Sequence, residues 1–274
     1  MKEGLVDFTK EDKYLVNKLY EEGCSLKEIS EITGLSYYET LFLLRHLVEQ
    51  LEIEKLVSCE TIQDSELLII SDTHLGSIYE NIDYIKEVYQ YAKKNHIQTI
   101  LHGGDFIQST MSNVKQELLD EKKQLEYAIK VYPYQEDIKN YILLGNHDYN
   151  TLKKGEVYFD ILKEREDFVF LGFKRAYLTW QNKLISVCHQ TKKYLLPIPS
   201  VDNFLNLKGH SHRLSHHKEK SVDIPTLSDD IFFHKKARPG FLVGTMDHKS
   251  LELDSYFFKD ERLTYEGNIL TKKM

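Results

Sequence analysis

Five short polar stretches of this 274-residue sequence hold the side chains that could do chemistry. They are Asp72-Thr73-His74, Gly104-Asp105, Gly145-Asn146-His147-Asp148, His189 and Gly209-His210-Ser211-His212. Carboxylate and carboxamide oxygens combined with neutral imidazole nitrogens suit Mn, Fe or Zn better than Mg. Two such ions in one pocket can activate water and hold a phosphoryl group, so these residue types favour metal-dependent ester hydrolysis.

Taken one at a time, the stretches carry little information. An Asp-x-His triplet is usually a turn beside a surface histidine, Gly-Asp is a common turn dipeptide, and His210 with His212 would suit a solvated loop. Each stretch, however, directly follows an apolar segment with the pattern of a strand. Because open α/β sheets bind ligands at the carboxyl ends of their strands, this order predicts that all five converge on one pocket.

The elements that must position these stretches alternate between strands and amphipathic helices from Glu66 onward. Strands are predicted at 67–70, 97–101, 141–144, 184–188 and 204–207. Apolar residues recur at helical spacing from Ile82 to Ala92, and a further helix is expected from about Val114 to Val131. By strand alternation, His102 should point away from Asp105 and pack in the core or behind the ligands.

The C-terminal part of the chain has a different pattern. From Phe241 to Tyr265 it alternates as exposed β-hairpins do. Before it, Ile224–Leu227 is expected to begin an edge strand, because proline is tolerated at a sheet edge.

Together the five stretches resemble the signature of the calcineurin-like metallophosphoesterase superfamily. That signature reads Asp-x-His, Gly-Asp, Gly-Asn-His-Asp/Glu, a lone His and Gly-His-x-His, and the resemblance spans about residues 65–265. It implies an α/β fold with the four layers α/β/β/α and a metal-dependent phosphoesterase activity. The gap between the second and third stretches is longer than in the smallest members, and the helix expected near 114–131 would explain it.

The resemblance also implies two divalent metal ions and their ligands. The first ion would be held by Asp72, His74, Asp105 and His212. The second would be held by Asp105, Asn146, His189 and His210. A shared carboxylate offsets the repulsion between two dications ~3.5–4 Å apart. We expect manganese, with iron, zinc or nickel as alternatives.

His147 and Asp148 are the predicted catalytic residues. A hydroxide generated on the metal pair at neutral pH would attack phosphorus in line with the leaving oxygen, which His147 would face and protonate or stabilise. Asp148 would orient the imidazole of His147. Arg213 could grip a phosphate, against the alternative of a solvated side chain, and Tyr79 and Tyr149 are candidate rim residues.

Residues 1–60 are predicted to form an all-α module ahead of a catalytic domain at 61–274. Seven Lys and Arg against 13 Asp and Glu place −6 of the total net charge of −7 in this module. Capping boxes, apolar pairs such as Leu15/Leu19 and Ile29/Ile32, and Gly34 predict three helices. The segment Leu26 to Leu44 resembles a helix-turn-helix motif.

The same module leaves two roles open. The exposed start of its third helix would offer Tyr37, Tyr38, Glu39 and Thr40, with Arg45 and His46 further along. Because phosphates repel a module of charge −6, docking or dimerisation is favoured over reading DNA, although a local basic face could still bind it. Either a monomer or a homodimer is compatible with its apolar stripes.

Three functions therefore compete. The favoured one is a phosphodiesterase that acts on nucleic acid or a nucleotide. The second is a phosphomonoesterase or small-molecule diesterase whose module serves docking or dimerisation. The third is a DNA-binding regulator with an inactive phosphoesterase domain, which the complete ligand set and the intact His147 count against.

Composition excludes other classes of protein. Hydrophobic residues make up 41% and charged residues 29%, which permits a packed core. No apolar run approaches the roughly 18 residues of a membrane span, so we expect no membrane partner. The charged N-terminus lacks a secretory apolar stretch and the three cysteines are not closely paired, so we expect a cytoplasmic protein.

Overall fold

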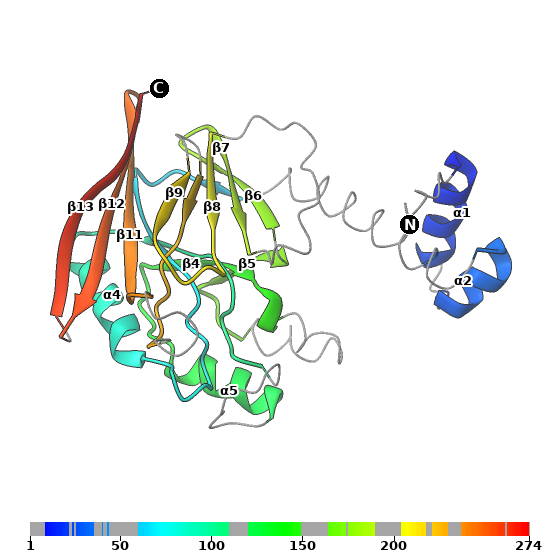
Figure 1. The fold of residues 1–274 in the computed structure, drawn as a ribbon, viewed down its shortest axis with the longest axis horizontal. Coiled ribbons are helices and arrows are strands. Elements are labelled where there is room, and N and C mark those ends of the chain that lie inside the picture. The colour runs from blue at the N-terminus through cyan, green and yellow to red at the C-terminus, as the bar shows by residue number, and fades with distance from the viewer. Residues whose placement is uncertain are drawn as a thin grey trace, which may run out of the picture. The chain divides into compact units, whose positions relative to one another are not determined.

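A computed structural model describes residues 9–21, 24, 26–35, 40, 43, 60–109, 120–148, 164–173, 175–189, 204–217, 221–229, 237–260 and 262–273. The chain forms two compact units, Met1–Ser58 and Cys59–Met274 (Figure 1). Among the residues that the structure describes, no helix is long and apolar enough to cross a membrane.

The N-terminal unit contains helices α1 (Lys10–Glu21) and α2 (Leu26–Thr33). The predicted capping box at the start of α1 is confirmed: the Thr9 N–H donates to the Asp12 carboxylate at 2.9 Å, and the Asp12 N–H donates to the Thr9 hydroxyl at 3.1 Å. Gly34 follows α2 with a φ of +73°, the left-handed conformation that ends helices.

The core of this unit differs in part from the predicted apolar stripes. Val16, Leu19, Ile29 and Leu43 are buried together. Leu15 and Ile32, in contrast, are 37% and 57% exposed, so the predicted pairs Leu15/Leu19 and Ile29/Ile32 are each wrong by one member. Val16 takes the core position because it lies three residues before Leu19, on the same helix face. The predicted DNA-reading residues Tyr37, Tyr38, Glu39, Arg45 and His46 lie outside the described residues. Thr40, expected to be exposed with them, is fully buried, so that part of the prediction is wrong.

The second unit contains two β-sheets. The seven-stranded sheet has the order β13-β12-β11-β2-β3-β4-β5. Its parallel part consists of β2 (Glu66–Ile70), β3 (Thr99–His102), β4 (Lys139–Leu144) and β5 (Phe168–Phe173). Its antiparallel part consists of β11 (Gly240–Met246), β12 (Ser250–Lys259) and β13 (Arg262–Lys273).

The six-stranded sheet has the order β1-β6-β7-β8-β10-β9. Its strands are β1 (Thr61–Ile62), β6 (Arg175–Trp180), β7 (Lys183–Cys188), β8 (Leu205–Lys208), β9 (Ser215–His217) and β10 (Ser221–Asp223). Strands β7 and β8 are parallel, so both end at the same edge of the sheet.

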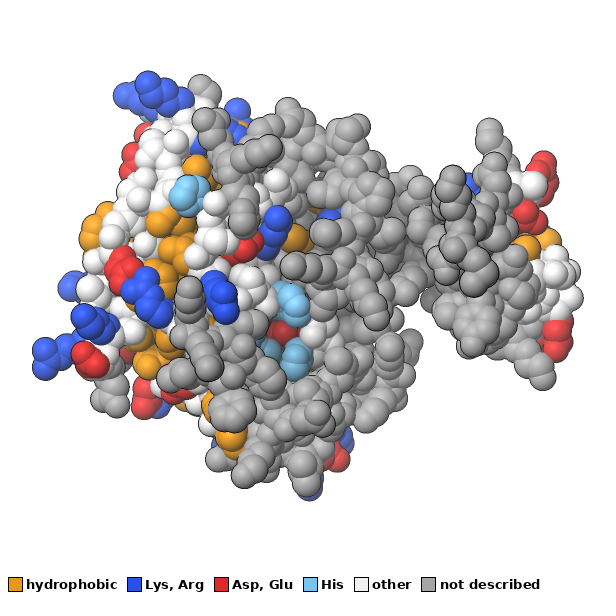
Figure 2. Space-filling view, in the orientation of Figure 1, with side chains coloured by type: hydrophobic (Ala, Val, Ile, Leu, Met, Phe, Trp, Pro, Cys, Tyr) orange, Lys and Arg blue, Asp and Glu red, His pale blue; other side chains and the backbone are white. Residues whose placement is uncertain are grey.

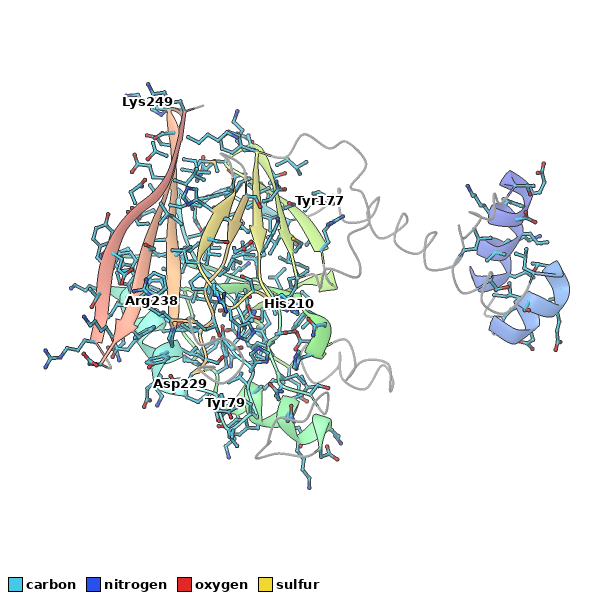
Figure 3. The ribbon with its side chains drawn as sticks, in the orientation of Figure 1. Tyr79, Tyr177, His210, Asp229, Arg238 and Lys249 are labelled. Carbon is cyan, nitrogen blue, oxygen red and sulfur yellow. The ribbon has the colours of Figure 1, made fainter. Side chains whose placement is uncertain are left out.

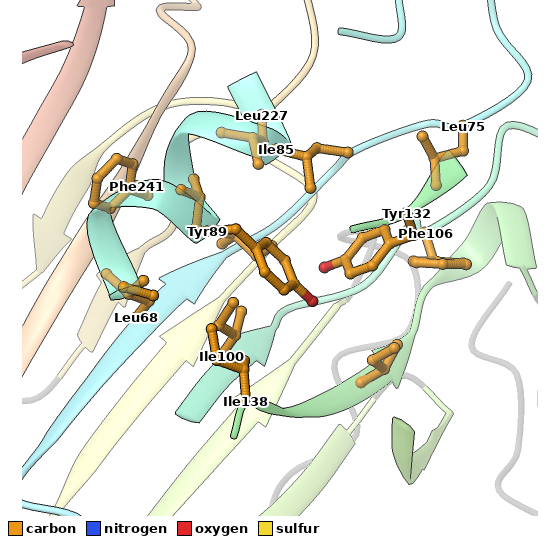
Figure 4. Packing of buried hydrophobic residues seen from close by; sticks show 14 of the residues in the cluster. Leu68, Leu75, Ile85, Tyr89, Ile100, Phe106, Tyr132, Ile138, Leu227 and Phe241 are labelled. Atoms are coloured by element: carbon orange, nitrogen blue, oxygen red, sulfur yellow. The ribbon is translucent and has the colours of Figure 1, made fainter. Parts of the chain in front are cut away.

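Two hydrophobic clusters hold these layers together. One joins the seven-stranded sheet to helices α4 (Ile82–Lys94) and α5 (Glu121–Val131), and Figure 4 shows part of it. The ring centroids of Tyr89 and Tyr132 in this cluster lie 5.9 Å apart, edge to face. The other fills the space between the two sheets, around the fully buried Trp180. The mixed α/β fold is therefore confirmed, although the described residues include no helix over the outer face of the six-stranded sheet.

The strands predicted before the polar stretches are all present, with ends within two residues of the prediction. In the C-terminal part, the predicted hairpins are confirmed by the antiparallel pairs β11–β12 and β12–β13, but two other expectations were wrong. Strand β11 is buried between β2 and β12 rather than exposed, because it extends the central sheet. Ile224–Leu227 does not begin an edge strand: it follows β10, which lies between β8 and β9.

Candidate metal centre

All five polar stretches begin within three residues of a strand end. Asp72 and His74 follow β2, Asp105 follows β3, and Asn146 and His147 follow β4. His189 follows β7, and His210 and His212 follow β8. Figure 2 shows histidine side chains gathered around an acidic side chain on one face of this unit, and Figure 3 labels His210 there. The predicted convergence is therefore present in the structure.

The side chains form two groups with metal-ligand spacing, and each group offers three ligand atoms that lie within 4.8 Å of one another. One group is Asp72, His74 and His212, and the other is Asp105, His189 and His210. A third combination, His74, Asp105 and His147, overlaps both groups. Asp105 therefore lies where a carboxylate could serve both groups.

Direct distances show how closely the groups meet. Nε2 of His212 lies 3.1 Å from Oδ1 of Asp72, and Nε2 of His189 lies 2.9 Å from Oδ2 of Asp105. Nε2 of His74 lies between the two aspartates, 3.8 Å from Asp72 Oδ1 and 3.9 Å from Asp105 Oδ2. These five side chains are all more than nine-tenths buried.

Five predicted ligands have left-handed backbone conformations although none is glycine. The φ angles are +56° at Asp72, +46° at His74, +53° at Asp105, +76° at His210 and +58° at His212. Such a conformation costs about 1–3 kcal/mol at each residue and persists only where the surroundings hold it. These backbone conformations therefore lower the stability of the fold, and they direct the five side chains toward one pocket.

Backbone hydrogen bonds between the loop after β2 and the loop after β3 hold the backbone of Asp72, His74 and Asp105 in place. The Asp72 N–H donates to the Gly104 carbonyl at 2.9 Å, and the His74 N–H donates to the Asp105 carbonyl at 3.1 Å. The Asp72 carbonyl accepts from the Thr226 hydroxyl at 3.0 Å. Sequence analysis missed Thr226, because its segment carries no motif. The segment follows β10, and only the folded structure shows that it lies beside Asp72.

The charges in the pocket favour a bound cation. Burial by itself raises the pKa of Asp72 and Asp105, but neighbouring imidazoles, chiefly His212 and His189 respectively, overcome it and hold both values below the ordinary range. Burial lowers the pKa of His189, but Asp105 and Asp72 outweigh it and raise that pKa to about 9. Burial, and then repulsion from His147, lowers the pKa of His74 to about 3. Two ionised carboxylates are thus enclosed beside a neutral His74 ring, and they hold a proton on His189 that a bound cation could replace.

Hydrogen bonding at the same atoms is incomplete within the described residues. Asp72 Oδ1 and His189 Nε2 are buried and have only the ion-pair contacts with His212 and Asp105, at 3.1 and 2.9 Å. Buried polar atoms normally have a partner. Divalent cations would satisfy these atoms, so the donor set fits a metal centre.

His147 lies at the pocket and its catalytic role stays a prediction, whereas Asp148 has other partners than expected. The His147 ring points its Nε2 toward Asp105 Oδ2 at 3.9 Å, and its Nδ1 lies 2.6 Å from the carbonyl oxygen of Gln108. Asp148 instead accepts backbone N–H groups of Phe106, Ile107 and Gly145 at 3.0, 2.9 and 2.7 Å. The expectation that Asp148 orients the imidazole is therefore wrong; its carboxylate ties two ligand loops together.

The remaining candidates lie around the pocket. His102 is fully buried behind the ligands, as predicted. Arg213 is exposed one residue after His212, and Tyr79 is half-buried in the loop after the first stretch. Tyr149 lies outside the described residues. The phosphate-binding role of Arg213 stays a prediction.

The model of the family described as calcineurin-like phosphoesterase matches residues 66–269. The chain belongs to this family. As a calcineurin-like phosphoesterase, it is a metal-dependent hydrolase that acts on phosphate esters, and its seven predicted ligands lie within the matched region. No curated protein matches the sequence.

Several solved structures resemble this phosphoesterase. A single mutant of Vps29 from Entamoeba histolytica is 13% identical with a TM-score of 0.47, and the alignment covers 76% of this chain and 99% of that one. A predicted phosphoesterase from Streptococcus pneumoniae is 16% identical with a TM-score of 0.40, covering 77% and 97%. The nuclease MPE of Pseudomonas putida is 15% identical with a TM-score of 0.38, covering 73% and 87%.

Proposed function

We propose that this phosphoesterase binds two divalent ions and hydrolyses a phosphodiester in a nucleic acid or a nucleotide. The observation that carries the proposal is the pair of three-residue groups with Asp105 facing both. Two cations so close together need a shared anion. Asp105 is suited to that role because it is buried and ionised between His74, His147 and His189.

Each residue would have a defined place in the site. One ion would be held by Asp72, His74, Asp105 and His212. The other would be held by Asp105, Asn146, His189 and His210. When bound, the ion pair would supply an activated water and a positive clamp for the phosphoryl group. Manganese suits this mixed oxygen and imidazole set, and iron, zinc and nickel remain alternatives.

His147 would provide the proton for the leaving group. A carbonyl oxygen only accepts, so Nδ1 of His147 carries a hydrogen that it donates to Gln108. Nε2 is then the atom that faces the pocket, close to Asp105. A protonated Nε2 would give its hydrogen to the departing oxygen as the P–O bond breaks, and the ring would return to the neutral form.

The choice of a diester follows from the combination of this centre with a second, helical unit that could bring the site to a nucleic acid. A phosphomonoester or a small diester is the second candidate. The acidity of residues 1–60 favours it, because a module of charge −6 repels polyanions and suits docking or dimerisation better.

Hydrolysis of bis-p-nitrophenyl phosphate and p-nitrophenyl phosphate by the Mn²⁺-loaded protein tests the proposal. We expect the diester to be cleaved faster. A screen of single-stranded DNA, duplex DNA, RNA and cyclic nucleotides would then identify the substrate class. Faster cleavage of the monoester would favour the second candidate, and cleavage of neither ester with any divalent metal would contradict both.

A further inference from the structure

The ring of His147 is oriented by main chain rather than by a side chain. Its Nδ1 hydrogen is donated to the carbonyl of Gln108, at 2.6 Å. A backbone carbonyl holds a ring only as firmly as its own peptide plane is held. The orientation of the peptide unit that joins Gln108 to Ser109 is therefore decisive for His147.

That peptide unit is fixed at its other end by helix α5. The N–H of Ser109, in the same planar unit as the Gln108 carbonyl, donates to Oε1 of Gln124 at 2.7 Å. Ser109 is fully buried and has a φ of +57°, a left-handed conformation that needs such support in a non-glycine residue. Gln124 is also fully buried.

The side chain of Gln124 has little freedom to turn. Gly76 packs directly against it: a Cβ atom at Gly76 would lie 2.6 Å from Cγ of Gln124. In the first turn of α5, Asp120 caps the helix by accepting the Lys123 N–H at 3.0 Å. Gln124 therefore presents its oxygen from a fixed support.

The other end of α5 is also anchored. The guanidinium group of Arg165 donates to the carbonyls of Ile129, Tyr132 and Pro133 at 3.0, 3.0 and 2.8 Å. Arg165 also binds the buried Asp167 through two hydrogen bonds. The helix lies in the long interval between the Gly-Asp and Gly-Asn-His-Asp stretches, so this interval supplies a rigid support.

We propose that Gln124 is a positioning residue for His147, acting through the single peptide unit between Gln108 and Ser109. The two hydrogen bonds run in one direction, from the His147 ring to the carbonyl and from the N–H to Gln124. Each polarises the same peptide group and strengthens the other. This arrangement fixes the plane of the His147 ring and aims its Nε2 toward the pocket. The inference rests on the proposed role of His147 as the proton donor.

The substitution Gln124→Met tests this, because methionine has a similar length and no strong acceptor. Two phosphodiesters that differ only in the leaving group would be compared with Mn²⁺: an alkyl alcohol, which needs a proton to depart, and nitrophenolate, which does not. We expect kcat for the alkyl ester to fall about tenfold or more, within the range of general acid catalysis, and kcat for the nitrophenyl ester to change less than about twofold.

Controls separate positioning from loss of structure. Lys123→Met places the same side chain at an exposed site of the same helix turn and should change neither rate. In a His147→Ala background, Gln124→Met should have no further effect on the alkyl ester, as a double-mutant cycle requires for residues that act together. Equal losses on both esters, no loss on either, or an added loss in the His147→Ala background would overturn the proposal.

A second readout does not depend on activity. In the ¹⁵N NMR spectrum of the metal-free protein, the Nδ1–H of His147 should give a hydrogen-bonded signal that weakens or shifts in Gln124→Met but not in Lys123→Met. An unchanged signal would contradict the positioning role. If the signal moves as expected while the native protein cleaves no ester, the positioning stands and the proposed function fails.

Discussion

The hydroxyl of Thr73 lies 3.0 Å from Nε2 of His102, and this contact joins the two loops that carry Asp72, His74 and Asp105. The Thr73 hydroxyl donates its hydrogen to the Phe106 carbonyl at 2.9 Å, so it can only accept from His102. Nδ1 of His102 accepts the Gly104 N–H at 3.2 Å. His102 is thus neutral with its hydrogen on Nε2, in agreement with burial lowering its pKa to about 4.

His102→Leu should therefore weaken metal binding without touching a ligand. The leucine fills the space but neither donates to Thr73 nor accepts from Gly104, so both loops lose support. We expect Mn²⁺ affinity to fall about 10- to 100-fold, the usual effect of groups that orient metal ligands. Isothermal titration calorimetry measures it, with His96→Leu as an exposed histidine control. Equal affinities for the two variants would refute this reading of His102.

Gly104→Ala should disrupt the site by a steric route. Gly104 has a φ of +111°, and a Cβ there would lie 2.4 Å from Nδ1 of His189. Gly267 is a matched control, because its φ of +134° is equally unfavourable for alanine while no atom lies within 4 Å of the added Cβ.

Gly267→Ala should lower the free energy of unfolding by about 1–2 kcal/mol and leave metal binding unchanged. Gly104→Ala should cost more and also abolish binding, since His189 must move. Urea denaturation and Mn²⁺ titration of both variants check this. Normal metal binding by Gly104→Ala would show that the space around His189 is wider than the structure indicates.

Removal of the metal should affect both activity and stability. A ligand that binds only the folded protein stabilises it by about 2.7 kcal/mol at a concentration 100 times its Kd. Dialysis against a chelator should therefore abolish ester hydrolysis and lower the Tm, and added Mn²⁺ should restore both. An Asp105→Asn variant, which lacks the shared charge, should regain little of either. Full activity after chelation would contradict a metal-dependent mechanism.

Most of the candidate site could be predicted from the sequence, because each ligand follows a strand and parallel strands end at a common edge. The role of Asp148 could not, since its partners are backbone N–H groups that no sequence pattern displays. Thr226 and Gln124 were missed for a related reason: each reaches the site through packing of distant segments. In α1, Leu15 and Val16 are equally apolar, and only tertiary packing decides which one is buried.

Arg165→Met should lower the free energy of unfolding strongly, although Arg165 lies at the end of α5 and not at the metal centre. The Arg165 and Asp167 side chains are 11% and 4% exposed, and removing one partner of a buried ion pair costs about 3–5 kcal/mol. Arg238 and Glu266 form an ion pair whose side chains are 56% and 35% exposed, so Arg238→Met should cost less than about 1 kcal/mol.

Urea denaturation compares the two variants, and the alkyl and nitrophenyl diesters compare their activities. Because Arg165 holds the C-terminal end of the helix that carries Gln124, its loss should reduce alkyl ester cleavage more than nitrophenyl ester cleavage. Arg238→Met should leave the ratio of the two rates unchanged. A stable Arg165→Met variant with the native ratio would mean that Gln124 keeps its place without this anchor.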